Sequence, residues 1–307
     1  MQDEACFVLP KILTKCYKRC SLRNELFFGK GMKFFTTEDN FLEIIRQHLP
    51  DVVPNSLELV KTGWTNFVIC VSDGDTEYFF RFPRNQFFAR MMLKDHAFCS
   101  FARDKVRFEF PNLQIFYDNG RPFSMHRKIQ GWSLADRIKF LSRQAITNVA
   151  YDIAQFIQDL NRIDPKTLPA ICHMPVSQFL DELPSVQFTA YDLKQHDFLK
   201  QLEKIPQVVH GDLNPGNIIL DRNDRVAGVI DFAFAGVSNS YVDLSRIIGR
   251  ASEAFEQPMM EAYKELVDHD VNEDFMKKIN EMWRYVDSHY ILFMKAKHPE
   301  IQLPDGC

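Results

Sequence analysis

The chain lacks any long hydrophobic run. It has 307 residues, 46% of them hydrophobic and 28 of them phenylalanine. No apolar stretch approaches the ~20 residues of a membrane-spanning helix. The first residues, Met1 to Glu4, are acidic and do not resemble a signal peptide. We therefore expect no membrane partner.

Cysteine is scarce and unevenly placed. The seven cysteines are odd in number and scattered, which favours reduced thiols and a cytoplasmic location over a disulfide framework. Cys16 and Cys20 could share a helix face, but no second ligand pair follows them. Ordinary thiols are therefore expected there, not a metal site.

The chain also lacks a strong charge of either sign. Its net charge of −4 is too small to indicate a nucleic-acid-binding surface. The 25% of charged residues is typical of a soluble globular protein, and the length suffices for about two domains or lobes.

The segment VVHGDLNPGNIILDRNDRVAGVIDFAF, residues 208–234, alternates short apolar runs with polar loops. Three short strands are predicted, the last two joined as a hairpin, and Gly211 allows a tight turn after the first. Asp212 then lies on a loop at a strand end, Asn217 precedes the second strand and Asp231 ends the third. The three side chains can converge on one point.

These residue types suit phosphoryl transfer. Mg²⁺ takes one or two protein carboxylates or amides together with water and nucleotide phosphates, so Asn217 and Asp231 suffice as metal ligands. Asp212 is then free to orient an acceptor hydroxyl and accept its proton as a general base. Such residues also favour ordinary turns. The apolar strands predicted next to all three residues favour a catalytic site over ordinary turns.

The motif HGDLNPGN followed by IDF resembles the catalytic loop of the aminoglycoside phosphotransferase family, the small-molecule branch of the protein-kinase-like fold. Leu59 to Arg84 resembles the first strands of the family, with a Phe-x-Pro-Arg pattern similar to that of aminoglycoside and macrolide phosphotransferases. Met125 to Leu134 resembles its hinge. The segments follow the order of the family over roughly residues 38–290.

The resemblance implies an α+β, bilobal protein-kinase-like fold. A small antiparallel-sheet N-lobe at 36–128 would bind nucleotide, and a mainly helical C-lobe at 129–307 would carry catalysis and the acceptor site. Residues 1–35 would form an N-terminal extension of unassigned role.

The resemblance also places the nucleotide. Its phosphates would lie under the turn at Gly63, and the backbone of Arg127 and Ile129 would face the nucleobase. Because those contacts are backbone ones, ATP and GTP are not distinguished.

Two residues depart from the family pattern. Arg81 and Asp95 stand where kinase-like folds have a strand lysine and a helix glutamate. Arginine presents a planar fork that can bridge phosphate and carboxylate, and its length can compensate for the shorter aspartate. Arg84 is the second candidate for the phosphates.

Periodicity predicts the remaining elements. Strands are expected at 57–61, 66–72, 77–83, 113–117 and 122–129. Helices are expected from 36 to 49 and at 133–141, 143–163, 176–183, 191–204, 241–255, 258–268 and 272–296.

Four further side chains receive roles. We expect His210 to support the catalytic loop through hydrogen bonds, and Asp243 matches a family carboxylate that braces this loop. Trp283 and Asp287 share one face of the last helix and are candidates for the acceptor pocket.

The predicted reaction is Mg²⁺-dependent transfer of the γ-phosphoryl group of ATP or GTP to a hydroxyl of a small molecule. The resemblance implies an aminoglycoside-type antibiotic as acceptor, and hence antibiotic resistance. Residues 251–307 hold twelve acidic and six basic residues, which would suit a cationic acceptor or form solvated helix faces. Asn239-Ser240 replaces a frequent Asp-Pro of the family and weakens the aminoglycoside assignment.

Other functions stay open. A metabolic kinase acting on choline, a sugar or an amino alcohol is the main alternative, and a non-catalytic nucleotide-binding protein is another. A protein kinase is disfavoured because Ala233 follows Asp231-Phe232 and no Ala-Pro-Glu occurs downstream. Acidic residues beside Asp212 would favour a polycation, and an aromatic cage a quaternary amine.

Overall fold

The computed structural model describes residues 32–49, 56–60, 65–174, 190–267 and 271–297. Internal contacts divide the chain into Met1–Lys33 and Phe34–Cys307. The predicted extension at 1–35 therefore lies almost wholly outside the described residues. The fold below is that of the second unit.

Five antiparallel strands form the first sheet, in the spatial order β1-β2-β3-β5-β4. Gly74, at φ +61°, makes the tight turn between the second and third strands. The strands lie within two residues of the predicted bounds. They are β1 (Ser56–Val60), β2 (Asn66–Asp73), β3 (Thr76–Pro83), β4 (Gln114–Asp118) and β5 (Arg121–Arg127).

Helix α2 (Phe41–His48) packs on this sheet. Phe80 and Phe82 of β3 are fully buried in the shared core, where Phe82 stacks on Phe123 of β5 with ring centroids 5.0 Å apart. Because neighbouring side chains of a strand point to opposite faces, Arg81 is left on the other face. The helix begins later than predicted because the side chain of Asn40 caps it.

Helix α3 (Gln86–Ala102) follows β3 directly. The side chain of Asn85 caps it by accepting a hydrogen bond from the Phe88 backbone N–H. Asp95 lies in its middle and is buried, on the side that meets Arg81.

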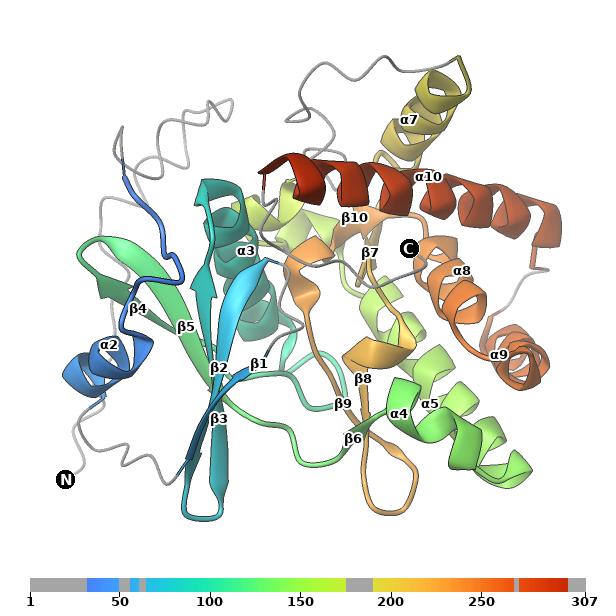
Figure 1. The fold of residues 1–307 in the computed structure, drawn as a ribbon. Coiled ribbons are helices and arrows are strands. Elements are labelled where there is room, and N and C mark those ends of the chain that lie inside the picture. The colour runs from blue at the N-terminus through green and yellow to red at the C-terminus, as the bar shows by residue number, and fades with distance from the viewer. Residues whose placement is uncertain (1–31, 50–55, 61–64, 175–189, 268–270, 298–307) are drawn as a thin grey trace. The chain divides into compact units, whose positions relative to one another are not determined.

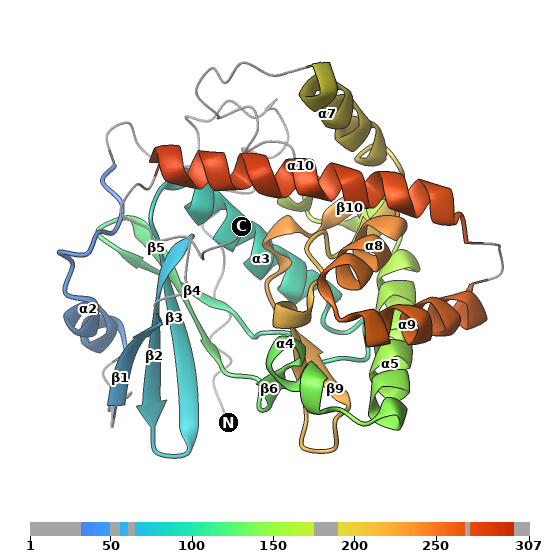
Figure 2. The same ribbon diagram turned by 45° about the vertical axis from the view of Figure 1, so that its right-hand side comes forward.

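The rest of the unit is mainly helical and shares one large apolar core. The views of Figures 1 and 2 agree that α10, the long red helix, runs past both α3 and α8. Its Phe293 contacts the rings of Phe87 and Phe88 on α3. The helices are α4 (Leu134–Arg137), α5 (Arg143–Asn161), α7 (Ala190–Leu202), α8 (Tyr241–Arg250), α9 (Glu253–Leu266) and α10 (Glu273–Lys297).

Two small sheets hold the 208–234 motif. β7 (Gln207–Val209) pairs with β10 (Gly236–Ser238), and β8 (Ile218–Leu220) lies between β6 (Trp132–Ser133) and β9 (Val226–Val229). All these pairs are antiparallel. The strands set both ends of the catalytic loop into the core.

Some elements differ from expectation. The helix predicted at 133–141 is wrong in form: Ser133 is paired in β6 and caps the short α4, and a 3₁₀ turn follows at 138–140. β10 was not predicted, and the helix predicted at 176–183 lies outside the described residues. The α+β prediction is confirmed.

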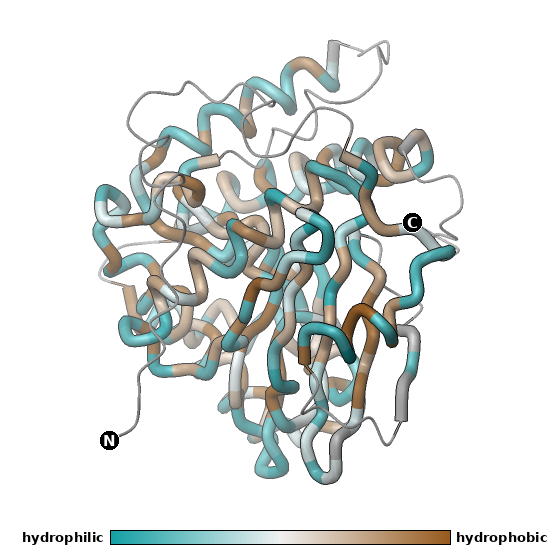
Figure 3. Tube along the Cα trace, turned by 90° about the vertical axis from the view of Figure 1, so that its left-hand side faces the viewer, coloured by the Kyte–Doolittle hydropathy of each residue, from teal (hydrophilic) through white to brown (hydrophobic). Residues whose placement is uncertain are grey.

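Hydrophobic and hydrophilic segments alternate along the chain in Figure 3. Within the part of the chain that the structure describes, no helix is long and apolar enough to cross a membrane.

Candidate active site

The catalytic loop leaves β7 through Gly211. This residue has φ +80°, and a Cβ atom there would lie 2.3 Å from the carbonyl oxygen of Phe234. Only glycine combines that backbone conformation with so close an approach. The 210–212 turn is therefore pressed against the end of the Asp231–Phe234 segment.

Asp243 of α8 holds this turn through hydrogen bonds to its backbone. Its carboxylate is fully buried and accepts hydrogen bonds from the backbone N–H groups of His210 at 2.7 Å and Gly211 at 2.8 Å. Burial raises the pKa of Asp243, against the opposing effect of these bonds. The predicted bracing role agrees with these contacts.

His210 is also fully buried and supports the loop. Its Nε2 lies 3.0 Å from the carbonyl oxygen of Ile230, and its Nδ1 accepts the backbone N–H of Asp212 at 3.2 Å. Nε2 thus joins the 210–212 turn to the residue after β9, and Nδ1 closes the turn itself. These contacts agree with the supporting role expected of His210.

Asp212 projects from this braced turn into an ion pair. Its Oδ1 accepts a hydrogen bond from Nε of Arg246 at 2.9 Å and forms an ion pair with the NH2 nitrogen of the same guanidinium at 2.7 Å. Its Oδ2 has no hydrogen-bond partner among the described residues. One oxygen is therefore fixed and the other is available to a substrate hydroxyl.

Arg246 is itself held on three sides. Its NH1 group contacts both oxygens of Asp287 at 2.8 and 3.0 Å, and its guanidinium lies 4.3 Å from the ring centroid of Trp283. Arg250, one turn further along α8, also pairs with Asp287. The chain Asp212–Arg246–Asp287–Arg250 links the catalytic loop to α10.

Asp231 occupies a strained position after β9. It is a non-glycine residue at φ +66°, in the left-handed region, where functional residues are often found. Burial, with the neighbouring carboxylates of Asp95 and Asp212, raises its pKa to about 7, against the opposing charge of Arg81. A carboxylate so crowded by negative charge is suited to a bound cation.

Asn217 fits the same interpretation. Its side-chain NH₂ donates to the carbonyl oxygen of Asp212 at 2.9 Å, which leaves Oδ1 with no hydrogen bond among the described residues. The backbone N–H of Ile230 donates to the Asn217 carbonyl oxygen at 2.9 Å, which connects the segment before β8 to the residue before Asp231. An amide oxygen and a carboxylate are donors that Mg²⁺ accepts.

Arg81 and Asp95 form the predicted pair. The guanidinium NH2 lies 2.7 Å from Oδ2 of Asp95, while Oδ1 accepts the backbone N–H of Phe232 at 3.2 Å. Asp95 therefore connects β3, α3 and the residue after Asp231. Arg84 instead lies 3.8 Å over the ring of Phe67.

The other predicted nucleotide contacts are placed as follows. Ile129 is buried, and its backbone makes no hydrogen bond among the described residues. Arg127 ends β5 opposite Tyr78 of β3. Gly63 lies outside the described residues.

A cavity of about 690 Å³ is lined by some of the predicted site residues. Arg81, Asp95, Asp212 and Asp231 all line it, but Asn217, Arg127, Ile129 and Arg84 do not. Its far side is formed by α8 and α10, including the predicted Trp283 and Asp287.

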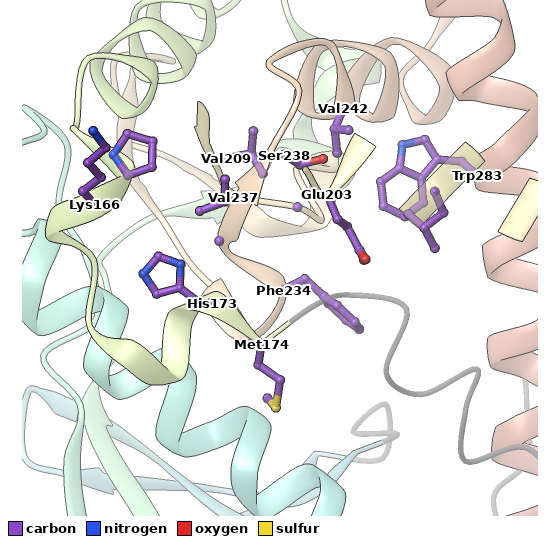
Figure 4. Close-up of a pocket in the computed structure, with 14 residues that line it drawn as sticks. Lys166, His173, Met174, Glu203, Val209, Phe234, Val237, Ser238, Val242 and Trp283 are labelled. Carbon is purple, nitrogen blue, oxygen red and sulfur yellow. The ribbon is translucent and has the colours of Figure 1, made fainter. Parts of the chain in front are cut away.

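A second cavity of about 230 Å³ shares Gly211, Phe234 and Trp283 with the first. Figure 4 shows Trp283 on the α10 side of it and His173 and Lys166 on the opposite side. Neither Asp212 nor Asp231 lines it, so the predicted catalytic residues lie at the larger cavity.

The sequence interpretation missed three arginines. Arg246, Arg250 and Arg284 line the larger cavity on its α8 and α10 side. The i, i+4 spacing of the first two on a helix was the available signal. Without the α8–α10 packing, nothing tied them to Asp212.

With this geometry established, comparison with known proteins decides the family. The model of the phosphotransferase enzyme family matches residues 56–275. The chain belongs to this family.

This phosphotransferase chain is similar in fold to several solved structures. One is the GDP complex of a mutant aminoglycoside 2'-phosphotransferase-IIIa, with 23% identity, 85% of this chain and 92% of that chain covered, and a TM-score of 0.65. Another is the streptomycin–ATP–APH(2")-IIa ternary complex, with 17% identity, coverages of 87% and 96%, and a TM-score of 0.60. The macrolide 2'-phosphotransferase MphH apoenzyme from Brachybacterium faecium has 14% identity, coverages of 87% and 99%, and a TM-score of 0.57.

These findings confirm the predicted family, the kinase-like α+β fold and the phosphotransferase class, with a hydroxyl group as acceptor. The match covers the cationic β3 residue, the catalytic loop and α8.

Proposed function

We propose that this phosphotransferase moves the γ-phosphoryl group of ATP or GTP to a hydroxyl of a small molecule, with Mg²⁺ held by Asn217 and Asp231. The observation that carries the proposal is that two carboxylates line one cavity: Asp212, whose Oδ2 has no partner among the described residues, and Asp231, which lies close to other negative charges. When bound, Mg²⁺ would neutralise the phosphates and Asp231 together.

The residues then have separate tasks. Asp212 would orient the acceptor hydroxyl and take its proton, which an ordinary carboxylate can do when the transition state is loose. Arg81, held by Asp95, would contact the phosphates. The backbone of Ile129, which makes no hydrogen bond among the described residues, and that of Arg127 would face the nucleobase. The turn at Gly63 would cover the phosphates. The GDP and ATP complexes of the similar structures support a nucleotide co-substrate.

Two acceptor classes are candidates. An aminoglycoside-type antibiotic, with a role in antibiotic resistance, is supported by the fold similarity to enzymes described with streptomycin and related compounds. A metabolic alcohol is the second, and the arginines on the acceptor side of the cavity favour it.

The test compares single substitutions in the two aspartates. We expect Asp212→Ala, and the equally sized Asp212→Asn, to lower kcat by about 10²- to 10⁴-fold with nearly unchanged nucleotide affinity. Asp231→Ala should instead abolish Mg²⁺-dependent nucleotide binding, measured by calorimetry with and without the metal. Asp274→Ala, whose carboxylate is 90% exposed on α10, is the control. Unchanged turnover in both Asp212 variants would contradict the proposal.

A further inference from the structure

The charges that line the large cavity are not spread evenly. Near the nucleotide side lie Arg81, Asp95 and Asp231, with two carboxylates to one guanidinium. On the acceptor side, where α8 and α10 meet the catalytic loop, two carboxylates, Asp212 and Asp287, face three guanidinium groups, Arg246, Arg250 and Arg284. The acceptor side therefore carries a net positive charge.

Both acceptor-side carboxylates are already paired with arginine. Oδ1 of Asp212 is bound by Arg246, and both oxygens of Asp287 are bound by Arg246 and Arg250. An ammonium group would find only Oδ2 of Asp212 without a partner among the described residues, and there it would lie next to the Arg246 guanidinium. A polycation, which needs several carboxylates, is disfavoured.

Trp283 does not offer an open ring face to a quaternary amine. It lines this cavity together with Phe87, Phe88, Phe234 and Tyr290, and the guanidinium of Arg246 lies over its ring at 4.3 Å. The ring of Trp283 is therefore already engaged by a protein cation, and the three guanidinium groups on this side of the cavity oppose the binding of a further cation.

The arginines on the acceptor side outnumber the carboxylates that pair with them. The surplus positive charge lies beside Asp287, at Arg250 and Arg284. The Arg250 side chain is 47% exposed and shares Asp287 with the more buried Arg246. Arg284 lies one helical turn before Asp287 on α10, lines the same cavity and has no ion-pair partner among the described residues. Two guanidinium groups thus remain able to bind an anion.

The acidic surplus of residues 251–307 does not offset this charge. Among the described acidic residues of this segment, Asp287 alone lines the cavity, and the others occupy exposed positions on α9 and α10. The described part of the surplus therefore forms solvated helix faces and does not support a cationic acceptor.

We propose that the acceptor of this enzyme is an alcohol that carries an anionic group, a carboxylate or a phosphate, which Arg250 and Arg284 bind while its hydroxyl meets Oδ2 of Asp212. The proposal rests on the phosphotransferase function proposed above. In the reaction the hydroxyl oxygen forms a bond to the γ-phosphorus of the nucleotide, the bond to the β-phosphate oxygen breaks, and the hydroxyl proton passes to Asp212. The products are a phosphate ester and a nucleoside diphosphate.

The first test uses acceptors matched in shape and different in charge: a hexose, its amino sugar, its uronate and its phosphate ester. Transfer from nucleotide is measured for the wild type and for the variant with both Arg250→Ala and Arg284→Ala. The proposed hydrogen bonds from the two arginines to the anionic group should favour the uronate or the phosphate ester. We expect kcat/KM for one of these acceptors to be about 10- to 100-fold above that for the neutral hexose. That ratio should fall toward one in the double variant and at high salt.

Arg222→Ala, on an exposed position of the β8–β9 loop, is the control and should keep the wild-type ratio. The uronate and phosphate arms separate the two anion types. Preference for the amino sugar, or a ratio that the double variant leaves unchanged, would overturn the anionic acceptor while the phosphotransferase function stands.

A second measurement decides the matter if no sugar is phosphorylated. Inorganic sulfate is titrated into the enzyme saturated with Mg²⁺ and nucleoside diphosphate, and the arginine Nε–H signals are followed by NMR. Saturable shifts with a millimolar Kd, assigned to Arg250 and Arg284 by their Lys variants, support the anion site even where turnover fails. Absence of those shifts overturns it.

Discussion

Asp212 and Asp231 belong to one motif yet have opposite surroundings. Asp212 lies beside a guanidinium that neutralises it, whereas burial and two neighbouring carboxylates raise the pKa of Asp231 to about 7. A general base needs a fixed oxygen and a free one, and a metal ligand needs uncompensated negative charge. The surroundings therefore support the two proposed roles more sharply than residue type does.

Arg246 should act as a positioning residue. Arg246→Met removes the hydrogen bond and the ion pair to Oδ1 of Asp212, and we expect kcat to fall about 10- to 100-fold because a small misplacement of a reacting group is costly. The KM for nucleotide should change little, and Arg246→Lys should recover part of kcat. Steady-state kinetics measure both.

Arg162→Met is the matched control, since that side chain is 70% exposed on the surface after α5. A parallel loss of nucleotide binding in Arg246→Met would show a general structural role instead.

At the scale of elements, the turn between β7 and the catalytic loop depends on one glycine. Gly211→Ala places a Cβ atom 2.3 Å from the Phe234 carbonyl oxygen and forces alanine to φ +80°. We expect a loss of at least about 2 kcal/mol in the free energy of unfolding, with loss of activity as Asp212 shifts. Urea denaturation and turnover measure the two effects.

Gly74→Ala isolates the backbone contribution. Gly74 has φ +61°, but a Cβ atom there would have nothing within 4 Å. Gly74→Ala should lower the free energy of unfolding by about 1 kcal/mol and leave kcat unchanged. Equal effects at both positions would show that the contact with Phe234 is unimportant.

At the scale of the whole described unit, α10 brings distant segments to one site. Phe293 is fully buried against Phe87 and Phe88 of α3, while Asp287, two turns earlier, reaches α8. One helix thus fixes both the helix that carries Asp95 and the arginine that holds Asp212.

Phe293→Ala should weaken this link. Removal of a buried aromatic ring predicts a loss of about 3–5 kcal/mol in unfolding free energy, measured by chemical denaturation. Leu292→Ala, at a neighbouring position that is 44% exposed, should change it by no more than about 0.5 kcal/mol. Similar losses for both variants would contradict the proposed packing.

The sequence determined the elements that depend on local pattern. The first sheet, most helices of the C-lobe, the 208–234 hairpin and the supporting role expected of His210 follow from apolar periodicity and from one dense motif. The bracing role expected of Asp243 followed from resemblance to a family. The Arg81–Asp95 pair followed from resemblance to a family, and its 2.7 Å contact is present.

Only the tertiary structure decided what surrounds Asp212. Arg246, Arg250 and Arg284 come from two helices, and their approach to the catalytic loop depends on the packing of α8 against α10, which no local pattern encodes. The acidic surplus of 251–307 suited either a cationic acceptor or solvated helix faces, because composition does not show which way a side chain points. On the acceptor side of the cavity, three guanidinium groups face two carboxylates.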